Sequence, residues 1–347
     1  MKKILLSLYL LGIVVTVSAQ VGGSAIFPFL EIPASARVAA LGGTYISAKD
    51  GDLSCGMQAP SLLNPEMDKS LSLSAVAYAD GAKFGDAAYA FTKGKAGTFM
   101  AGMHYASYGQ FLETDDFGNI QGTFHAADYC MQLGWGYQYN HDFSVGAAIK
   151  TIYSDYYIYN ALGFATDISA TYTDTITHWT ITLEGRNIGA TVNSYVEGNS
   201  EPLPGEALFG ASKRLAHTPL RFNLTYRHLE RMDLSYLDVL DKGDVDPLTG
   251  IAQQKKINFA NKFSRHFIFA AEILLSKNFN LRASYNFERR RELSVDTRPG
   301  LVGFSFGAGI KISKFVISYG FARYHLAAAA NHFSISTNLA EFMHKAN

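Results

Sequence analysis

A long series of alternating strands dominates this chain between Leu71 and Leu339. In the clearest segment, residues 278–288, apolar side chains stand at every second position from Phe279 to Phe287, with polar side chains between them. Because side chains of a strand point alternately to its two faces, this segment has one apolar wall and one polar wall. The same pattern predicts fourteen strands, at residues 70–79, 84–93, 96–108, 122–139, 142–156, 158–173, 177–188, 205–216, 218–229, 264–276, 278–289, 301–313, 314–324 and 331–340.

The gaps between these strands alternate in length as well. Even-numbered gaps are tight turns, such as Asn140-His141, whereas most odd-numbered gaps are longer, although those near Asp80 and Tyr157 are short. Short periplasmic turns and longer external loops are typical of a transmembrane β-barrel. An even number of strands with short even gaps places both termini in the periplasm. The long external loops are expected at residues 109–121, 189–204, 230–263, 290–300 and 325–330.

A soluble β-sandwich also alternates, with its apolar face inward. Three features favour a membrane barrel. Many predicted strands reach the ~9–11 residues needed to cross a bilayer tilted, and fourteen strands close too widely for a filled apolar core. Aromatic residues such as Tyr137, Phe143 and Tyr153 lie near strand ends, as interface girdles do. The predicted fold class is therefore all-β, a 14-stranded antiparallel transmembrane β-barrel over residues 70–341, with a tail at 342–347.

The composition argues against several function classes. Charged residues make up 17% of the chain, and 30 Lys and Arg balance 30 Asp and Glu. Nucleic-acid binding usually needs a clear basic excess, so no such partner is expected. The ten histidines are scattered and no His-Glu-x-x-His occurs. We therefore expect no enzyme, no metal and no cofactor, with a surface hydrolase as the alternative, because a Ser-His-Asp triad is recognised by geometry and not by sequence order.

Residues 1–19 have the features of a secretory signal peptide. Lys2 and Lys3 form a positive start, residues 4–17 are apolar, and Val17-Ser18-Ala19 is a small-residue cleavage site. No later stretch offers the ~20 consecutive apolar residues that a spanning helix needs. The expected location is the outer membrane of a Gram-negative bacterium, with both termini periplasmic and the long loops external.

Residues 20–69 differ from the barrel. Pro33, Ala34 and Ser35 predict the start of a short helix that Gly42-Gly43 would end, and a further helical turn is expected near Pro60 to Asn64. The segment is interpreted as a small, partly helical plug or hatch in the barrel lumen. A periplasmic extension outside the barrel is the alternative.

The plug segment also carries a resemblance to a known family. After Gly22-Gly23 come a Phe-x-Phe-Leu run and a Pro-x-Ser-Ala-Arg-x-Ala-Ala-Leu-Gly-Gly run. This motif resembles the PorV/PorQ family of the type IX secretion system, and the barrel is similar to FadL-like barrels in architecture alone. The sequence departs from the family at residues 58–64, where the family often has Asn-Pro-Ala-Leu-Leu. The motif residues are Phe27, Phe29, Leu30, Pro33, Ser35, Ala36, Arg37, Leu41, Gly42 and Gly43.

The resemblance implies a role without catalysis. Such a barrel would be a scaffold of the attachment complex, holding a PorZ-like surface protein near the PorU sortase and PorV, so that secreted cargo is linked to lipopolysaccharide. The alternative is a FadL-like transporter of small hydrophobic molecules across the outer membrane. The polar lumen faces of the predicted strands count against that alternative.

The insert at 230–263 is the largest predicted loop. Its apolar residues, together with Arg289, Arg290 and Arg291 at a strand end, predict a surface for a protein partner or for anionic lipopolysaccharide. Asp238, Asp241, Asp244 and Asp246 predict a solvated acidic loop, with calcium binding as the alternative. The apolar candidates for the partner-binding loop are Met232, Leu234, Tyr236, Leu237, Val239 and Leu240.

Two smaller features concern the lumen. Cys55 lies in the predicted plug and Cys130 on the predicted lumen face, so a disulfide between them would fix the plug to the wall. Two free thiols are the alternative.

Gly303, Gly307 and Gly309 lie on one strand face and are interpreted as small lumen residues that make room for the plug.

Overall fold

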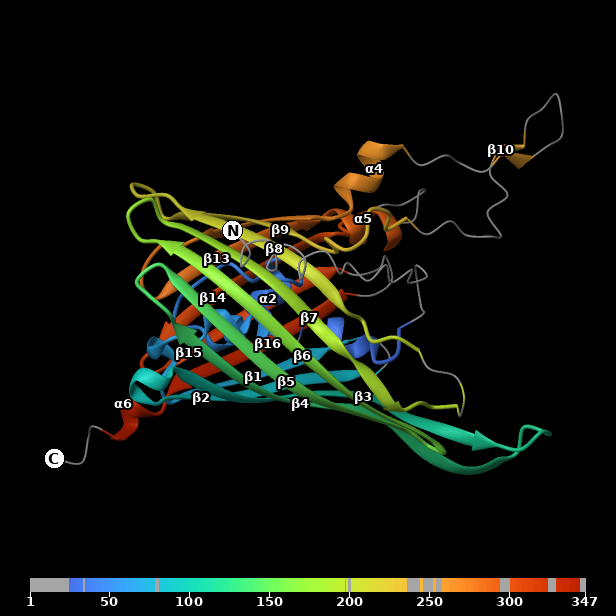
Figure 1. Ribbon diagram of the computed structural model, residues 1–347. Coiled ribbons are helices and arrows are strands. Elements are labelled where there is room, and N and C mark those ends of the chain that lie inside the picture. Colours follow the sequence, from blue (N-terminus) through green and yellow to red (C-terminus); the bar gives the residue numbers. More distant parts are fainter. Residues whose placement is uncertain are drawn as a thin grey trace, which may run out of the picture.

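Fourteen antiparallel strands close into one barrel (Figure 1). The computed structural model describes residues 25–33, 35–78, 81–196, 198, 201–235, 244–245, 252–253, 258–293, 300–323 and 329–343. The predicted signal peptide at 1–19, Gly22-Gly23, Ala34 and residues 344–347 lie outside the described residues. The predicted fold class is confirmed.

The strands follow one another around the barrel in sequence order, and β1 closes the ring against β16, with Ser72 opposite Ser336. Their bounds are β1 Ser70–Ala77, β2 Lys83–Thr92, β3 Thr98–Thr114, β4 Ile120–Gln138, β5 Phe143–Tyr156, β6 Tyr159–Asp174, β7 Trp179–Asn193, β8 Glu206–Arg214, β9 Leu220–Tyr226, β12 Phe267–Ile273, β13 Phe279–Asn286, β14 Phe304–Ile312, β15 Phe315–Arg323 and β16 Ala329–Asn338. The insert between β9 and β12 contains a separate pair, β10 Asp244–Val245 and β11 Ala252–Gln253.

The prediction of a loop at 109–121 is wrong for most of these residues, which belong to strands β3 and β4. Strands β3 and β4 continue as a paired hairpin beyond their barrel neighbours and turn only at residues 115–119 (Figure 1). An irregularity in the register between Ser107 and Gln110 marks where the hairpin leaves the wall. The predicted loop at 189–204 also begins late, because β7 runs to Asn193.

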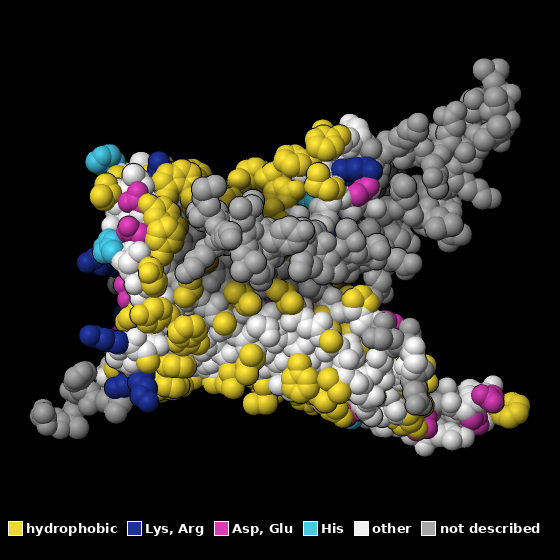
Figure 2. Space-filling view, in the orientation of Figure 1, with side chains coloured by type: hydrophobic (Ala, Val, Ile, Leu, Met, Phe, Trp, Pro, Cys, Tyr) yellow, Lys and Arg dark blue, Asp and Glu magenta, His cyan; other side chains and the backbone are white. Residues whose placement is uncertain are grey.

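The outer wall is apolar, as the alternation predicts. On β13, Phe279 and Leu281 are exposed while Arg282, Ser284 and Asn286 are buried on the lumen side. Charged side chains gather at the two ends of the barrel, and hydrophobic ones lie along the visible wall (Figure 2). Ring contacts between neighbouring strands, such as Phe91 with Phe99 near the tight-turn end, resemble an interface girdle. None of the helices in the described ranges is long and apolar enough to cross a membrane.

The described residues before β1 lie inside the barrel, in blue in Figure 1. We call residues 25–33 and 35–69 the plug. Its buried apolar side chains form the core of the protein together with lumen-facing residues of the wall. The helices of the plug are η1 Pro28–Glu31, α2 Ala36–Ala40, α3 Leu53–Gln58, η2 Pro60–Leu62 and η3 Pro65–Met67, and those elsewhere are η5 Gly94–Ala96, α4 Phe259–Ser264, α5 Phe287–Leu293 and α6 Ala340–Met343.

Wall glycines make room for the plug where the two approach closely. A Cβ on Gly307 would lie 2.5 Å from the Cβ of Ala40 in helix α2, so the interpretation of Gly307 is confirmed. At Gly303 and Gly309 the nearest atoms to an added Cβ belong to residues outside the plug. Gly303 precedes β14 with φ +87° and lies against Arg290, whereas Gly309 lies against Asn280 and Arg282 of the wall itself.

Candidate functional site

Arg37 anchors the plug to the barrel wall. It extends from the short helix α2, which ends at Ala40 and is followed after one residue by Gly42 and Gly43, where φ values of +96° and +98° favour glycine. Its Nε and Nη2 each donate to the carboxylate of Glu272 on β12 at 3.0 Å. Its Nη1 and Nη2 also donate to Asp50 of the plug at 2.9 and 2.8 Å. Its Nη1 donates to Asp52 at 3.1 Å as well, so three carboxylates hold one buried guanidinium in a fixed orientation.

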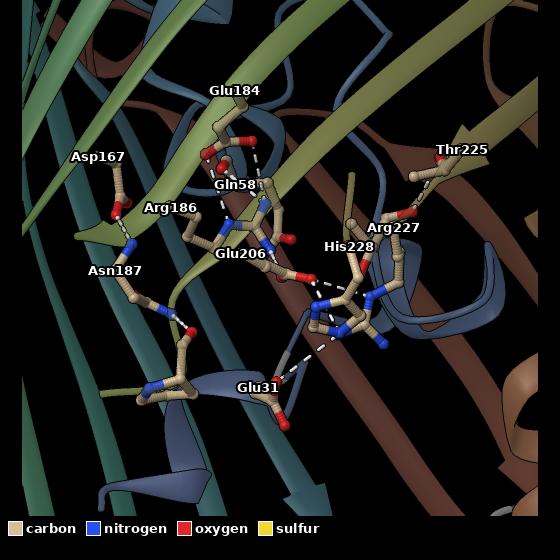
Figure 3. Close-up of polar contacts among 12 residues, drawn as sticks. Glu31, Gln58, Asp167, Glu184, Arg186, Asn187, Glu206, Thr225, Arg227 and His228 are labelled. Atoms are coloured by element: carbon tan, nitrogen blue, oxygen red, sulfur yellow. Dashed lines mark hydrogen bonds and ion pairs between the residues drawn. The ribbon is translucent and has the colours of Figure 1, made fainter. Parts of the chain in front are cut away.

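A second ion-pair network lies on the neighbouring strands β7 and β8 and reaches Arg227, which directly follows β9 (Figure 3). Arg186 of β7 lies between Glu184 and Glu206, at 3.2 and 3.4 Å, and its Nη2 donates to the backbone oxygen of Gln58 in the plug at 2.9 Å. Glu206 in turn pairs with Arg227 at 3.0 Å. The network thus joins the plug to two wall strands.

An irregularity in β7 positions this network. The register against β6 shifts between the pairs Thr166–Ile188 and Ile168–Gly185, and Asn187 has φ +54°. As a result Arg186 and Asn187, although consecutive, both point into the lumen and are buried. Asn187 accepts a hydrogen bond from Lys150 Nζ at 2.8 Å, and Lys150 also pairs with Asp167 at 2.7 Å.

These buried charges are paired with one another. A buried charge without a partner is costly, whereas paired charges fix orientation and register. Within the described ranges no group of three or more His, Cys, Asp or Glu side chains could hold a metal ion. Two cavities lie beside these networks.

The larger cavity lies at the long-loop end and has a volume of about 1020 Å³. One part of its wall is apolar and includes Phe29 and Ile32 of the plug with Phe84 of β2. Another part is charged, with Arg227, Arg231, Arg265, Arg289 and Arg291. A cavity with these two parts can take a molecule with an apolar body and a polar or anionic end.

Two carboxyl groups at this cavity have altered acidity. Burial raises the pKa of Glu292 in helix α5 to about 7, and the neighbouring Glu288 carboxylate adds to the effect, while Arg265 opposes it. Burial also raises the pKa of Glu31 in the plug, against the effect of Arg227, which lies 3.7 Å away. The cavity wall therefore carries less negative charge than its carboxyl count suggests.

A smaller cavity of about 310 Å³ lies on the other side of helix α2, at the tight-turn end. Its wall is polar and contains Ser35 and Arg37 of the plug with Ser334 of β16. The amide of Ala36 donates to Ser334 Oγ at 2.8 Å, so the start of α2 separates the two cavities along β16.

The predicted partner-binding loop is only partly described. Met232 is 80% exposed, whereas Leu234 is 4% exposed and lines the larger cavity, so Leu234 is not a surface contact. Arg289, Arg290 and Arg291 lie in helix α5 and not at a strand end. Arg289 and Arg291 line the cavity, and Arg290 donates to the backbone oxygen of Gly300. The side chains of Tyr236, Leu237, Val239, Leu240, Asp238, Asp241, Asp244 and Asp246 lie outside the described residues.

All ten residues of the family motif belong to the plug. Phe27 is buried against Gly163, Phe29 lines the larger cavity, and Arg37 is the anchor described above. The backbone of Gly43 comes so close to Arg289 that a side chain would overlap it. The remaining motif residues are Leu30, Pro33, Ser35, Ala36, Leu41 and Gly42.

The predicted disulfide is absent. Cys55 and Cys130 are both buried free thiols. They lie in different apolar clusters, Cys55 with Val38 and Leu41 and Cys130 with Phe27 and Ile152. Packing inside the lumen, without a covalent link, holds both side chains in place.

The sequence reasoning did not identify the residues that pair with the plug. Asp50, Asp52 and Glu272 around Arg37, and Glu206 beside Arg186 and Arg227, were not singled out. A usable signal was present, because Glu184 and Arg227 stand on the polar faces of predicted strands. A charged residue on a lumen face requires a partner, although alternation alone does not say which one.

The barrel, its apolar outer wall and its internal plug define the class, a plugged barrel of the outer-membrane type. No protein-family model matches the sequence, and no curated protein matches it. Among solved structures, the toluene transporter TbuX of Ralstonia pickettii aligns with a TM-score of 0.54 at 12% identity, over 89% of this chain and 99% of TbuX. The ΔS2S3 mutant of the monoaromatic hydrocarbon channel TodX gives 0.52 at 14%, over 88% and 98%.

A FadL homologue of Pseudomonas aeruginosa aligns with a TM-score of 0.48 at 10% identity, over 88% of this chain and 98% of its own. At the identities of TbuX and the TodX mutant, the likeness shows the fold, that of a FadL-like outer-membrane barrel. The resemblance of the plug motif to the PorV/PorQ family stays a prediction.

Proposed function

We propose that this protein carries small hydrophobic or amphipathic molecules across the outer membrane of a Gram-negative bacterium. The observation that carries the proposal is the cavity of about 1020 Å³ at the long-loop end, with its apolar and arginine-rich parts. An apolar body would pack against Phe29 and Phe84, and an anionic end would bind arginine. The names of TbuX and TodX, a toluene transporter and a monoaromatic hydrocarbon channel, support this reading by analogy of fold alone.

In this proposal the apolar outer wall lies in lipid, with the tight turns and both termini in the periplasm and the long loops outside. Exposed apolar residues at mid-strand, such as Leu133 and Ile149, support it, because they would face water in any other setting. The predicted signal peptide at 1–19 supports the same route. Lipopolysaccharide would then surround the long-loop end.

The proposal is tested by uptake of labelled toluene and labelled octanoate into cells that produce the protein. Phe84→Asp places a charge in the apolar part of the cavity and is expected to reduce uptake of both compounds strongly. Phe117→Asp is the matched control, because Phe117 is 91% exposed at the tip of the β3–β4 hairpin. Equal uptake in cells with and without the protein would refute the transport proposal.

A scaffold in the type IX attachment complex is the second candidate. Two buried ion-pair networks fasten the plug to the wall, as a static scaffold would require. The motif residues that resemble the PorV/PorQ family build that plug. In this reading the long loops hold a PorZ-like surface protein near the PorU sortase and PorV, and the barrel catalyses nothing.

Affinity purification of the tagged protein from outer membranes in mild detergent separates the two candidates. Recovery of a PorU-like sortase, PorV and a PorZ-like protein, in amounts comparable to the barrel, supports the scaffold. A barrel without these proteins that retains a small hydrophobic molecule supports the transporter. Recovery of neither would contradict the scaffold and leave the uptake assay to decide on transport.

A further inference from the structure

The smaller cavity, at the tight-turn end, has an uneven distribution of charge. Its lining includes five basic residues and three acidic ones. Lys277 lies in the turn between β12 and β13, so the cavity reaches that end of the barrel. The basic residues are Arg37, Arg221, Arg282, Lys277 and Lys311, and the acidic ones are Asp50, Asp52 and Glu272.

Arg282 is the least compensated of the buried cations in this cavity. The Glu272 carboxylate accepts hydrogen bonds from Arg37, Arg221 and Arg282. Arg37 and Arg221 each have Asp50 as a second carboxylate. Among the described residues, Arg282 pairs with Glu272 alone, at 3.2 Å, and its Nη1 makes a long hydrogen bond of 3.4 Å to Ser318 Oγ. Its side chain is 4% exposed, so water screens this charge little.

Two buried polar atoms in the lining of this cavity have no hydrogen-bond partner within the described part of the chain. They are Ser35 Oγ at the start of helix α2, which can donate to an anion, and Asn280 Oδ1 on β13, an acceptor that needs a donor such as water. Ser35 is only 5% exposed. Because buried polar groups normally have partners, these atoms indicate that something polar occupies the cavity.

Gly309 of β14 leaves room for the side chains of Asn280 and Arg282. A Cβ on Gly309 would lie 2.7 Å from Asn280 Oδ1 and 3.1 Å from Arg282 Nη2. Because this wall position has no side chain, the Asn280 amide and the Arg282 guanidinium occupy the space beside β14 that a side chain would fill.

We infer that this cavity binds a small oxyanion, either free phosphate or the carboxylate end of a small amphiphile. Arg282 donates from its guanidinium, Ser35 and Ser318 donate from their hydroxyls, and Lys277 attracts the anion at the entrance. Charge-assisted hydrogen bonds of this kind are the strong ones in proteins. Water alone would satisfy the hydroxyls but would leave the charge of Arg282 with its single shared carboxylate.

The test is calorimetric titration of the full-length protein in a non-ionic detergent with sodium phosphate, against sodium chloride at equal ionic strength. We expect saturable binding of one phosphate per chain and none of chloride. Arg282→Gln and Ser35→Ala should each weaken phosphate binding by about tenfold, the effect of one hydrogen bond to a charged group. Ser35→Ala keeps the experiment decisive if Arg282→Gln fails to fold. Arg214→Gln, an exposed arginine at the same end of the barrel, is the matched control and should bind as wild type does.

A second titration with octanoate distinguishes the two sources of the oxyanion. Octanoate that competes with phosphate and binds more tightly identifies the carboxylate of an amphiphile. Phosphate binding that octanoate leaves unchanged identifies free phosphate. No saturable binding of either compound, or equal binding by wild type and both variants, would overturn the inference. The result is independent of the proposed transport, because it is measured at equilibrium and without uptake.

Discussion

Arg37 of the plug and Glu272 of strand β12 form a two-bond ion pair across 235 positions of sequence. The pair is buried on both sides, so it fixes the plug to a single place on the wall. The Arg37 guanidinium also lies over the ring of Tyr45, which donates to the same carboxylate at 2.9 Å. Removal of Arg37 would leave the carboxylates of Glu272, Asp50 and Asp52 with only Arg221 and Arg282 as cationic partners, and an undercompensated buried charge is costly.

Arg37→Met is therefore expected to destabilise the folded barrel by about 3–5 kcal/mol. Arg37→Lys should lose less because it keeps the charge, and it should still lose some stability because lysine lacks the planar fork that bonds three carboxylates at once. The measurement is the urea midpoint at which the compact band is lost in unheated gels. Arg214→Met, at an exposed arginine, is the control. Equal midpoints for Arg37→Met and wild type would show that the pair does not anchor the plug.

Asp50 gives the anchor a defined pH dependence. Burial alone would raise its pKa, but the Arg37 and Arg221 guanidiniums bonded to it hold the pKa well below the ordinary 3.8. A carboxyl with a lowered pKa contributes its full stability above its unfolded-state pKa and loses it as the pH falls toward the folded-state pKa. Wild type should therefore lose stability below about pH 4.

Asp50→Asn is the matched variant for this effect. It should be less stable than wild type near neutral pH and should show a shallower loss of stability below about pH 4, because one titrating group is gone. The free energy of unfolding is measured by urea titration at several pH values. Parallel acid limbs in both proteins would show that Asp50 does not contribute.

The alternation of side chains predicted the wall of this protein well. On β13, Phe279 and Leu281 point outward, whereas Arg282, Ser284 and Asn286 point into the lumen, as a period of two requires. The helix of the plug was predicted to end at Gly42-Gly43, and the positive φ angles there explain why. These features depend on neighbouring residues, which a single sequence displays.

The hairpin and the ion pairs depend on more distant parts of the chain. Residues 108–114 are suited to a strand, and they lie outside the barrel wall because β2 begins only at Lys83, opposite Ser107. The partner of Arg37 was equally hidden, because several lumen-facing carboxylates satisfy the same pattern. The choice of Glu272 follows from where α2 lies against β13, β14 and β15, which alternation does not encode.

The close approach of η2 to the wall predicts a position that accepts only glycine. A Cβ on Gly136 of β4 would lie 2.6 Å from the backbone oxygen of Pro60 and 2.6 Å from the Cβ of Leu63. Gly136→Ala should destabilise the barrel by about 1–3 kcal/mol and displace the plug. Ion conductance in planar bilayers should then rise.

Gly51→Ala is the control for Gly136→Ala. Gly51 also belongs to the plug, but a Cβ there would meet its nearest atoms at 3.7 Å, an ordinary contact. This variant should conduct as wild type does. Equal conductance of Gly136→Ala and wild type would mean that η2 yields without moving the plug.

The two cysteines should behave as buried free thiols. Burial raises the pKa of the Cys55 thiol well above its ordinary value, so little thiolate is available to react. Iodoacetamide should modify neither Cys55 nor Cys130 in the folded protein and both after unfolding. The modification is read by mass mapping of non-reduced digests. A linked peptide containing both residues would restore the disulfide hypothesis.

The outer wall provides the test of membrane embedding. Ile149 lies in the middle of β5, is 60% exposed and is paired in register with Leu133, which is 56% exposed. If lipid surrounds this band, Ile149→Arg should destabilise the barrel by about 2–4 kcal/mol, the cost of an arginine at the bilayer midplane. Asp155→Arg places the same side chain on the outer face near the last residue of the same strand, and it should lower the free energy of unfolding by only about 0–1 kcal/mol.

Both variants are refolded into lipid vesicles and into detergent micelles, and the free energy of unfolding is compared. In thin-bilayer vesicles the difference between Ile149→Arg and Asp155→Arg should be smaller than in thick-bilayer vesicles, because the arginine reaches the interface more easily. Equal costs for the two positions in every vesicle would mean that the band around Ile149 does not lie in the hydrocarbon region.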